Sequence, residues 1–476
     1  MMRSLYSGVS GLKNHQIRMD VVSNNVSNVN TIGFKRGRVT FQDMISQNMS
    51  GASKPREGRG GVNPKQIGLG MQVAAIDTIH TQGAIQVTGK ITDVALMGKG
   101  FFIQKQGERI FYTRAGNFGI DRDKYLVNPA NGFKIQGWNS TTLPDGSTFI
   151  NTSAPTGDII VPVGDKYPAK ATTNVKYKCN LNASAHIPTN PNNPTRKEIA
   201  SGATHTTSIN VYDSRGRTHK VNITFVRQDE NTWIAKVNVP NSIPNTTQVD
   251  VGPRSATATN QLIFKFNNAG SPESLRDVVA PGQRADSITR REGQENQPQI
   301  KAKLRFNVPD DRKQATGQNQ GEQLEIELDF GTIGKLNGVT QYNGETTTKA
   351  VSQDGYGMGY LESFQINDSG IVIGSYSNGQ RRELAQIAVA TFVNPEGLER
   401  AGDTTFIQTV NSGRAQVGVA QSQGRGRIVA GSLEMSNVDL SEEFVDMIVT
   451  QRGFQANSRS ITTSDQMLQE ILTLKR

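Results

Sequence analysis

Apolar residues recur at helical spacing at both ends of this chain. Near the N-terminus the steps between them are 4, 3, 7, 3, 4 and 3 residues, which is typical of a seam on one helix face. The positions are Leu5, Val9, Leu12, Met19, Val22, Val26 and Val29. Near the C-terminus the apolar positions recur every seven residues, at Met447, Phe454, Ile461 and Leu468, with Phe444 and Leu472 extending the stripe. Both termini are therefore predicted to be amphipathic helices.

The boundaries of these helices carry capping signals. The Asn-rich run "NNVSNVNTIGFK" follows the first seam, and Gly33 suits a C-terminal cap. Asp439 and Glu442 resemble a capping box that opens the last helix. Polar residues interrupt both seams, at Gln16, Ser23, Gln451, Ser458 and Asp465. A self-sufficient coiled coil seldom has such gaps, so we expect the helix pair to be loose alone and to depend on neighbouring copies.

Between the ends, the pattern changes to short strands. Residues 34–90 are polar and Gly-rich and predict a linker or extended segment. Strand patterns follow at 100–104, 110–121 and 125–138, where "NPANG" signals a turn. Later strands lie within 359–380, with turns at Asp368-Ser369-Gly370 and Asn378-Gly379, and 384–394 has the pattern of a buried strand.

The middle of the chain has strands of its own, broken by polar runs such as 280–299, which we expect to be a loop or disordered. The fold class is therefore predicted to be mainly β with terminal α-helices, in nested discontinuous domains. Residues 1–33 and 434–476 would form a two-helix coiled-coil core domain, and 34–90 an extended linker. Residues 91–165 and 351–433 would form a β domain in two segments, with 166–350 inserted as a second β domain.

Charge is concentrated at the two ends with opposite sign. Residues 1–65 carry ten Lys or Arg against three acids, while residues 434–447 carry five acids and no base. We expect the two ends to attract each other, unless both are merely solvated faces. The N-terminal bases lack interleaved aromatic residues and spread around the helix, which argues against nucleic-acid binding. The chain also lacks a run of about 20 apolar residues and an apolar signal peptide, so membrane insertion and cleavable secretion are not expected.

The sequence offers little for conventional catalysis. The five histidines show no metal-ligand spacing, and no nucleophile, base and orienting group come together in a recognisable motif. "GKGFFI" has too few glycines for a phosphate loop. These patterns predict a protein that is not an enzyme and that needs no cofactor or metal.

Four stretches of the chain carry a resemblance to a known family. They are "SLYSGVSGLKNHQIRMDVVSNNVSNVNTIGFKR" (4–36), "GKGFFI" (98–103), "YTRAGNFGIDRDKYLVNPANGFKIQGW" (112–138) and "GSLEMSNVDLSEEFVDMIVTQRGFQANSRSITTSDQMLQEILTLKR" (431–476). These stretches resemble the bacterial flagellar rod and hook proteins. The large insertion at 166–350 is similar to that of hook proteins, with a distal rod protein as the alternative.

The resemblance implies a tubular homopolymer that acts as a curved universal joint. Its helices would surround a channel and its β domains would form the outer shell. Such subunits leave the cell through the flagellar type III export apparatus and meet a hook cap protein, rod proteins and hook–filament junction proteins. The location implied is the flagellar hook, periplasmic in a spirochaete and extracellular otherwise.

Cys179 is the single cysteine in the 476 residues. Strand alternation groups it with Val175, Tyr177 and Leu181, so it is either a small inward-facing core residue or one partner of a bond with another subunit. An intersubunit disulfide is one such bond. The resemblance to spirochaete hook proteins implies another, a self-catalysed lysinoalanine cross-link that starts from dehydroalanine at Cys179. In that interpretation Asn180 orients the backbone, Lys176 and Lys178 favour the thiolate if near in space, and Lys166 (or else Lys170) of the next copy is the acceptor.

Overall fold

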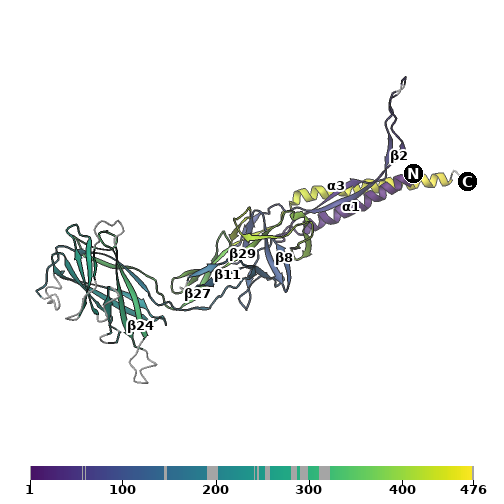
Figure 1. Ribbon diagram of the computed structural model, residues 1–476. Coiled ribbons are helices and arrows are strands. Elements are labelled where there is room, and N and C mark those ends of the chain that lie inside the picture. Colours follow the sequence, from purple (N-terminus) through teal and green to yellow (C-terminus); the bar gives the residue numbers. More distant parts are fainter. Residues whose placement is uncertain are drawn as a thin grey trace. The chain divides into compact units, whose positions relative to one another are not determined.

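The computed structural model describes residues 2–55, 57–58, 60–143, 147–189, 202–240, 242–243, 246–251, 258–279, 287–289, 298–309 and 322–473. The chain divides into two compact units (Figure 1). The terminal unit comprises 1–163, 362–375 and 381–476, and the inserted unit comprises 164–361 and 376–380.

Both predicted terminal helices are present. Helix α1 spans Met2–Ser27 and helix α3 spans Leu440–Thr473. Asp439 caps α3 as predicted, because its Oδ1 accepts hydrogen bonds from the backbone N–H of Ser441 at 2.8 Å and of Glu442 at 3.4 Å. The side chain of Glu442 instead forms an ion pair with Arg36 at 2.6 Å. The fold class predicted from the sequence, mainly β with helical ends, is confirmed.

The segment between α1 and the β domain is extended but carries paired strands. Strand β1 (Gly37–Asp43) pairs antiparallel with β4 (Met71–Thr78), and β2 (Ser46–Ser50) pairs with β3 (Lys65–Gly68). Along β4, half-buried and exposed residues alternate. This alternation lies among glycines and polar residues, which is why composition alone indicated a linker. Residues of β2 and β3 are exposed throughout.

The rest of the terminal unit is a β domain built from both chain segments. The N-terminal segment supplies β5 (Ile85–Val87), β6 (Val94–Met97), β7 (Phe101–Gln106), β8 (Arg109–Thr113), β9 (Gly119–Ile120), β10 (Leu126–Val127), β11 (Lys134–Thr142), β12 (Thr148–Ile150) and β13 (Gly157–Asp158). The C-terminal segment supplies β28 (Ile371–Tyr376), β29 (Arg381–Thr391), the short 3₁₀ helix Pro395–Gly397, β30 (Glu399–Gly402), β31 (Thr405–Ile407), β32 (Gln416–Val419), β33 (Arg427–Ala430) and β34 (Ser432–Glu434).

The two segments share one sheet and one core. The strand order in the sheet runs β28-β29-β11-β7-β8-β31-β30, so the buried strand β29 lies beside β11 and β7. The predicted turns are present, because Gly132, Gly370 and Gly379 all adopt positive φ, at 70°, 78° and 78°. The core contains Phe101, Trp138 and Phe406 among others.

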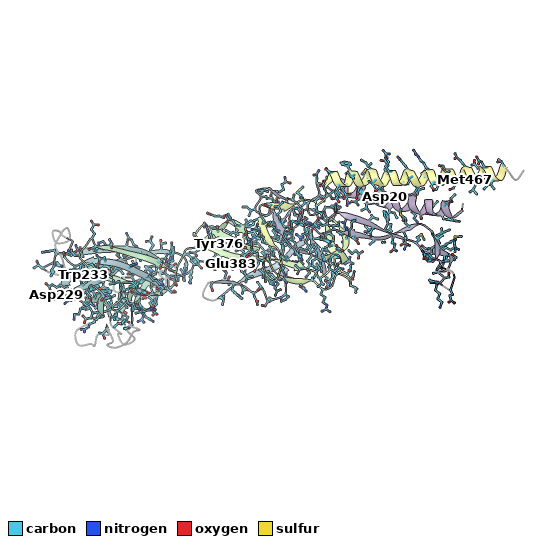
Figure 2. The ribbon with its side chains drawn as sticks, turned by 90° about the horizontal axis from the view of Figure 1, so that it is seen from above. Asp20, Asp229, Trp233, Tyr376, Glu383 and Met467 are labelled. Atoms are coloured by element: carbon cyan, nitrogen blue, oxygen red, sulfur yellow. The ribbon has the colours of Figure 1, made fainter. Side chains whose placement is uncertain are left out.

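The inserted unit contains its own strands. They are β14 (Lys166–Tyr167), β15 (Asn174–Asn182), β16 (Thr204–Tyr212), β17 (Thr218–Asp229), β18 (Thr232–Asn238), β19 (Gln248–Asp250), β20 (Ala258–Phe266), β21 (Pro272–Val279), β22 (Ser287–Thr289), β23 (Gln299–Val308), β24 (Glu322–Thr332), β25 (Val339–Tyr342) and β26 (Thr347–Gln353). Strand β27 (Gly359–Ile366) crosses the division of the chain, since residues 359–361 belong to the inserted unit and 362–366 to the terminal unit. Within the described residues, two six-stranded sheets contribute to one hydrophobic core, and Trp233 is fully buried in it (Figure 2). Of the polar run 280–299, residues 280–286 and 290–297 lie outside the described residues, and Ser287–Thr289 form β22.

Candidate assembly surface and cross-link site

Helices α1 and α3 lie side by side and run antiparallel (Figure 1). Contacts run from Ser4, whose hydroxyl is 3.4 Å from that of Ser464, to Asn25, whose amide donates to Glu443 at 3.1 Å. Small residues bring the backbones close, since a Cβ placed on Gly11 would lie 2.5 Å from the amide nitrogen of Asn457. Small and polar residues therefore supply contacts along the interface, and Ile461 packs closely against Gly8.

The apolar seam expected between the helices is covered only in part. Val22 is 4% exposed and most of the other described seam positions are half-buried, whereas Val9 of α1 is 47% exposed and Phe444 of α3 is 50% exposed. Further large apolar side chains outside the predicted seam are exposed on the first turns of α3. The two-helix coiled coil therefore stays a prediction. We call the uncovered residues Phe444, Val445, Ile448 and Val449 the α3 apolar face.

The opposite charges of the two chain ends pair as predicted. Arg18 lies 3.0 Å from Asp446, and Arg36 lies 2.6 Å from Glu442. Glu443 is buried, and this burial raises the pKa of its carboxyl, while hydrogen bonding from Asn25 and the charge of Arg36 oppose the rise. The alternative of two merely solvated faces is excluded for these residues.

A fully buried ionic cluster joins the chain ends to the β domain. The carboxylate of Glu434 lies 2.5 Å from the amine of Lys35 and 3.2 Å from the guanidinium of Arg114, and the side chains of Lys35 and Glu434 are both 0% exposed. Glu434 also accepts the backbone N–H of Gly83 at 3.0 Å, and Lys35 donates to the Thr81 carbonyl at 2.7 Å. Burial lowers the pKa of the Lys35 amine, and Glu434 opposes that shift. The cluster fixes the segment after α1 to residues 81–83 and to the segment before α3.

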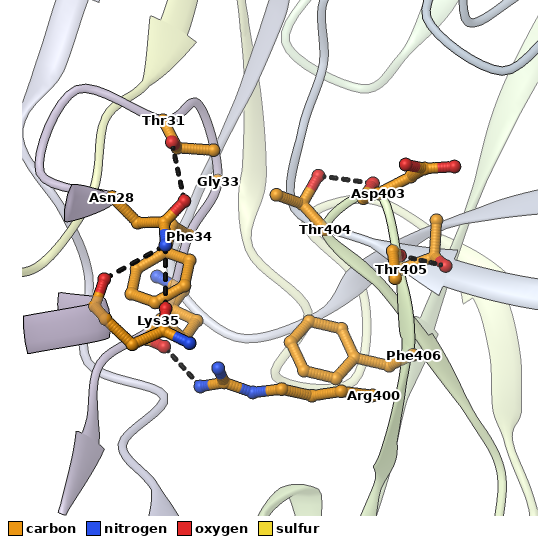
Figure 3. A pocket seen from close by; sticks show the side chains of 12 residues that line it. Asn28, Thr31, Gly33, Phe34, Lys35, Arg400, Asp403, Thr404, Thr405 and Phe406 are labelled. Carbon is orange, nitrogen blue, oxygen red and sulfur yellow. Dashed lines mark hydrogen bonds between the residues drawn. The ribbon is translucent and has the colours of Figure 1, made fainter. Parts of the chain in front are cut away.

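A small cavity opens beside this cluster (Figure 3). Its volume is about 290 Å³, and Asn28, Phe34, Arg400 and Phe406 are among the residues that line it. The guanidinium of Arg400 donates to the backbone carbonyl of Lys35 and lies 5.2 Å from the ring centroid of Phe34. These contacts also join the segment after α1 to the hairpin of β30 and β31.

Cys179 lies on β15 in the inserted unit and faces its core. It is 5% exposed, and Val175, Tyr177 and Leu181 on the same strand face are also buried. Strand β15 pairs with β25 in parallel and with β26 antiparallel, which sets Cys179 opposite Val339 and Thr348. Lys176 and Lys178 alternate onto the other, exposed face. The condition under which these two lysines would favour the thiolate, nearness in space, is therefore not met within this strand, because neighbouring side chains of a strand point to opposite faces.

Asn180 and Thr340 join the backbone of β15 to that of β25. The Asn180 side-chain carbonyl accepts the N–H of Tyr342 at 2.9 Å. The hydroxyl of Thr340, a buried residue, lies 3.2 Å from the Cys179 carbonyl oxygen and 3.4 Å from the Asn180 side-chain oxygen, and it can donate to either. Local sequence patterns do not indicate Thr340, because its position depends on the pairing of strands more than 150 residues apart in the chain.

The two candidate acceptor lysines lie on a short segment of the same unit. Lys166 belongs to β14, pairs with Tyr360 of β27 and is exposed, with its amine 5.8 Å from the Tyr360 ring centroid. Lys170 is half-buried and forms an isolated bridge with Tyr356. Lys166 is thus the more open of the two to a neighbouring molecule.

Within the part of the chain that the structure describes, no group of three or more His, Cys, Asp or Glu side chains is arranged to hold a metal ion. No helix among those residues has the length and apolar character needed to cross a membrane.

Comparisons with known proteins define first the class and then the family. Family models for the flagellar basal body rod protein and the flagellar basal body rod FlgEFG protein C-terminal region match residues 5–35 and 429–474. The models for the flagellar hook protein FlgE/F/G D1 domain and the flagellar basal body protein FlaE D2 domain match residues 95–163 and 180–356. These matches define a structural protein of the flagellar rod and hook class.

Full-length relatives show which family within this class the chain belongs to. The chain is 49% identical to the flagellar hook protein FlgE of Borreliella burgdorferi and 46% identical to that of Treponema pallidum, in each case over 100% of both chains. It is 33% identical to the hook protein of Salmonella typhimurium over 99% of this chain and 100% of the other. The chain therefore belongs to the flagellar hook protein FlgE family, and these homologues are structural proteins rather than enzymes.

Proposed function

We propose that the chain assembles into a curved tubular hook that works as a universal joint between rod and filament. The observation that supports this most is the α3 apolar face, which one molecule leaves uncovered. An exposed row of large apolar side chains is costly in water and is typical of a surface that another protein covers. Membership of the hook family indicates that further copies of the chain cover it.

The same proposal includes a route by which the subunits are exported and a location for the assembled hook. Subunits pass unfolded through the flagellar type III export apparatus and meet the hook cap, rod and junction proteins at the growing end. The contact between α1 and α3 contains small and polar residues, and this supports the export of unfolded subunits. Such a contact separates more easily in water than one made of large apolar side chains. The two spirochaete relatives favour a periplasmic flagellum.

Electron microscopy of the purified polymer tests the proposal of a curved joint. Curved tubes are expected, and a sample that contains straight tubes alone would favour the distal rod alternative.

We further propose that assembled copies become covalently linked through Cys179. A base removes the Cα proton of Cys179, the C–S bond breaks, and the sulfur leaves as hydrosulfide, which yields dehydroalanine. The unprotonated amine of Lys166 from the next copy then adds to Cβ, and Cα regains a proton. The net change is the loss of one H₂S for each lysinoalanine formed, with no oxidant or reductant.

The contacts around β15 support this chemistry. Removal of the Cα proton places negative charge on the Cys179 carbonyl oxygen, to which the Thr340 hydroxyl can donate at 3.2 Å. Asn180 holds the adjacent strand through its bond to Tyr342. Because Cys179 is 5% exposed and faces the core, the lysine can reach it only after the surroundings of β15 rearrange. Contact between copies would supply that movement, which would confine the reaction to the polymer.

Tandem mass spectrometry of polymerised protein tests the cross-link. A Cys179–Lys166 peptide that has lost H₂S is expected, and a Cys179→Ala polymer should still form but dissociate on boiling in detergent. Lys166→Arg should remove the link, whereas the matched exposed variant Lys176→Arg should retain it. A thiol that survives at Cys179 in mature polymer would refute the cross-link and leave the hook assignment intact.

A further inference from the structure

The terminal unit contains a second cavity, beside the buried ionic cluster. Its volume is about 370 Å³, which is within the usual range for small-ligand sites. It is lined by segments that include the start of β7, the end of β29 and the loop at 421–424. Its polar lining includes His80, Lys99 and Arg114, and its apolar lining includes Phe101, Phe392 and Val393. None of the described residues that line it is acidic.

Arg114 has hydrogen-bonding capacity to spare at this place. It is 4% exposed, and its two terminal nitrogens bond to the Leu96 and Gly98 carbonyls and to Glu434. Its Nε has no hydrogen-bond partner, although the atom is buried. A buried N–H without an acceptor is unfavourable, so an acceptor that reached this atom after a small shift of the side chain would be stabilised.

The charges around His80 are also unbalanced. Its ring packs edge-on against Phe101 and Phe406, with centroids 5.5 Å and 5.3 Å away. Burial, followed by the positive charges of Lys35, Arg114 and Arg400, lowers the pKa of His80 to about 4, and the Pro395 carbonyl only partly opposes this. Glu434 neutralises only part of this positive charge, which leaves a field that attracts an anion.

We propose that this cavity binds a carboxylate attached to an apolar group. The carboxylate would accept from Arg114 and be attracted by Lys99 at the mouth, and the apolar group would lie against Phe101 and Phe392. The aromatic lining and the single spare guanidinium donor favour a carboxylate over a phosphate, which takes several charged donors. The carboxylate could come from a free small molecule or from a second copy of this chain. This inference goes beyond the hook assignment and does not depend on the cross-link.

Titration calorimetry on the full-length monomer tests the proposal with benzoate as the probe. Benzamide serves as a neutral control of the same shape. Benzoate is expected to bind at least about tenfold more tightly, because only it carries the charge that the cavity attracts. Val393 lies at the mouth and is 79% exposed, so Val393→Trp should abolish binding without unfolding the protein. Val410→Trp, at an exposed position outside the cavity lining, should leave binding unchanged.

A milder variant tests the contribution of Lys99, and an assembly assay tests where the carboxylate comes from. Lys99→Gln should weaken benzoate about two- to fivefold, as expected for an exposed charge. Polymerisation in excess benzoate separates the sources: inhibition indicates a carboxylate from a second copy, and normal assembly with benzoate bound indicates a free ligand. The absence of saturable benzoate binding, or equal binding by benzamide or by Val393→Trp, would overturn the proposal.

Discussion

The inserted unit and the terminal helices bury their apolar residues in opposite ways. In the inserted unit, Phe225, Phe264, Phe306 and Phe330 are all 0% exposed. On α3, Phe444, Val445, Ile448 and Val449 are each at least half exposed. The first region completes its core within one chain, and the second leaves large apolar side chains uncovered beside its contact with α1. One sequence thus encodes both a domain with a complete core and an apolar surface that a single chain does not cover.

The largest contrast should come from two matched phenylalanine truncations. Phe264→Ala removes a ring that packs against Phe225 and Phe330, so it should lower the free energy of unfolding of the inserted unit by about 3–5 kcal/mol. Phe444→Ala should change monomer stability by less than about 0.5 kcal/mol and yet prevent polymer formation. Urea unfolding in a Trp138→Phe background, with Trp233 fluorescence as the signal, measures the effect on stability. Electron microscopy measures the effect on polymer formation. A Phe444→Ala protein that builds normal tubes would remove the distinction between the two regions.

The buried cluster should behave unlike the rest of the terminal interface. Glu434→Gln keeps the shape but leaves Lys35 and Arg114 without an anion, so it should destabilise the terminal unit by about 3–5 kcal/mol. Trp138 fluorescence in a Trp233→Phe background would report this loss. The inserted unit should unfold as before, and a loss of equal size in both units would contradict the assignment of the cluster to one of them.

His80 should make the terminal unit sensitive to acid. Its pKa is lowered to about 4 in the folded chain, so the unfolded chain binds more protons between about pH 6.5 and pH 4. Stability should therefore fall as the pH drops through that window, by up to about 3 kcal/mol. His80→Phe preserves the aromatic contacts and should flatten this part of the pH profile. An unchanged acid dependence in the variant would show that His80 is not the responsible group.

The smallest effect is expected at the exposed end of the interface. The ion pair of Arg18 with Asp446 is partly open to solvent, so Arg18→Gln should cost only about 0.5 kcal/mol and less at high salt. Chemical denaturation of monomer at low and high salt would measure it. A loss comparable with that of Glu434→Gln would mean that exposed and buried charges contribute alike, contrary to the expectation from their burial.

Periodicity and turn chemistry were sufficient to predict much of this fold. Both terminal helices, the Asp439 cap, the glycine turns and the inward orientation of Cys179 follow from local patterns. The attraction of the chain ends followed from charge alone, and Arg18, Arg36 and the acids of α3 confirm it. Local patterns could not reveal which helix faces meet, because Gly11 and Asn457 are far apart in the chain. Arg114, His80 and Thr340 were missed for the same reason, since their surroundings are assembled from distant strands.

Hydrogen exchange of the full-length protein, compared between monomer and purified polymer, would show whether the terminal helices are completed only by assembly. If assembly completes the helices, amides of α1 and α3 should exchange rapidly in the monomer and slowly in the polymer, while amides of β15, β20 and β24 should be equally protected in both. Helices that are as well protected in the monomer as in the polymer would contradict the claim that their apolar surface is covered only by assembly.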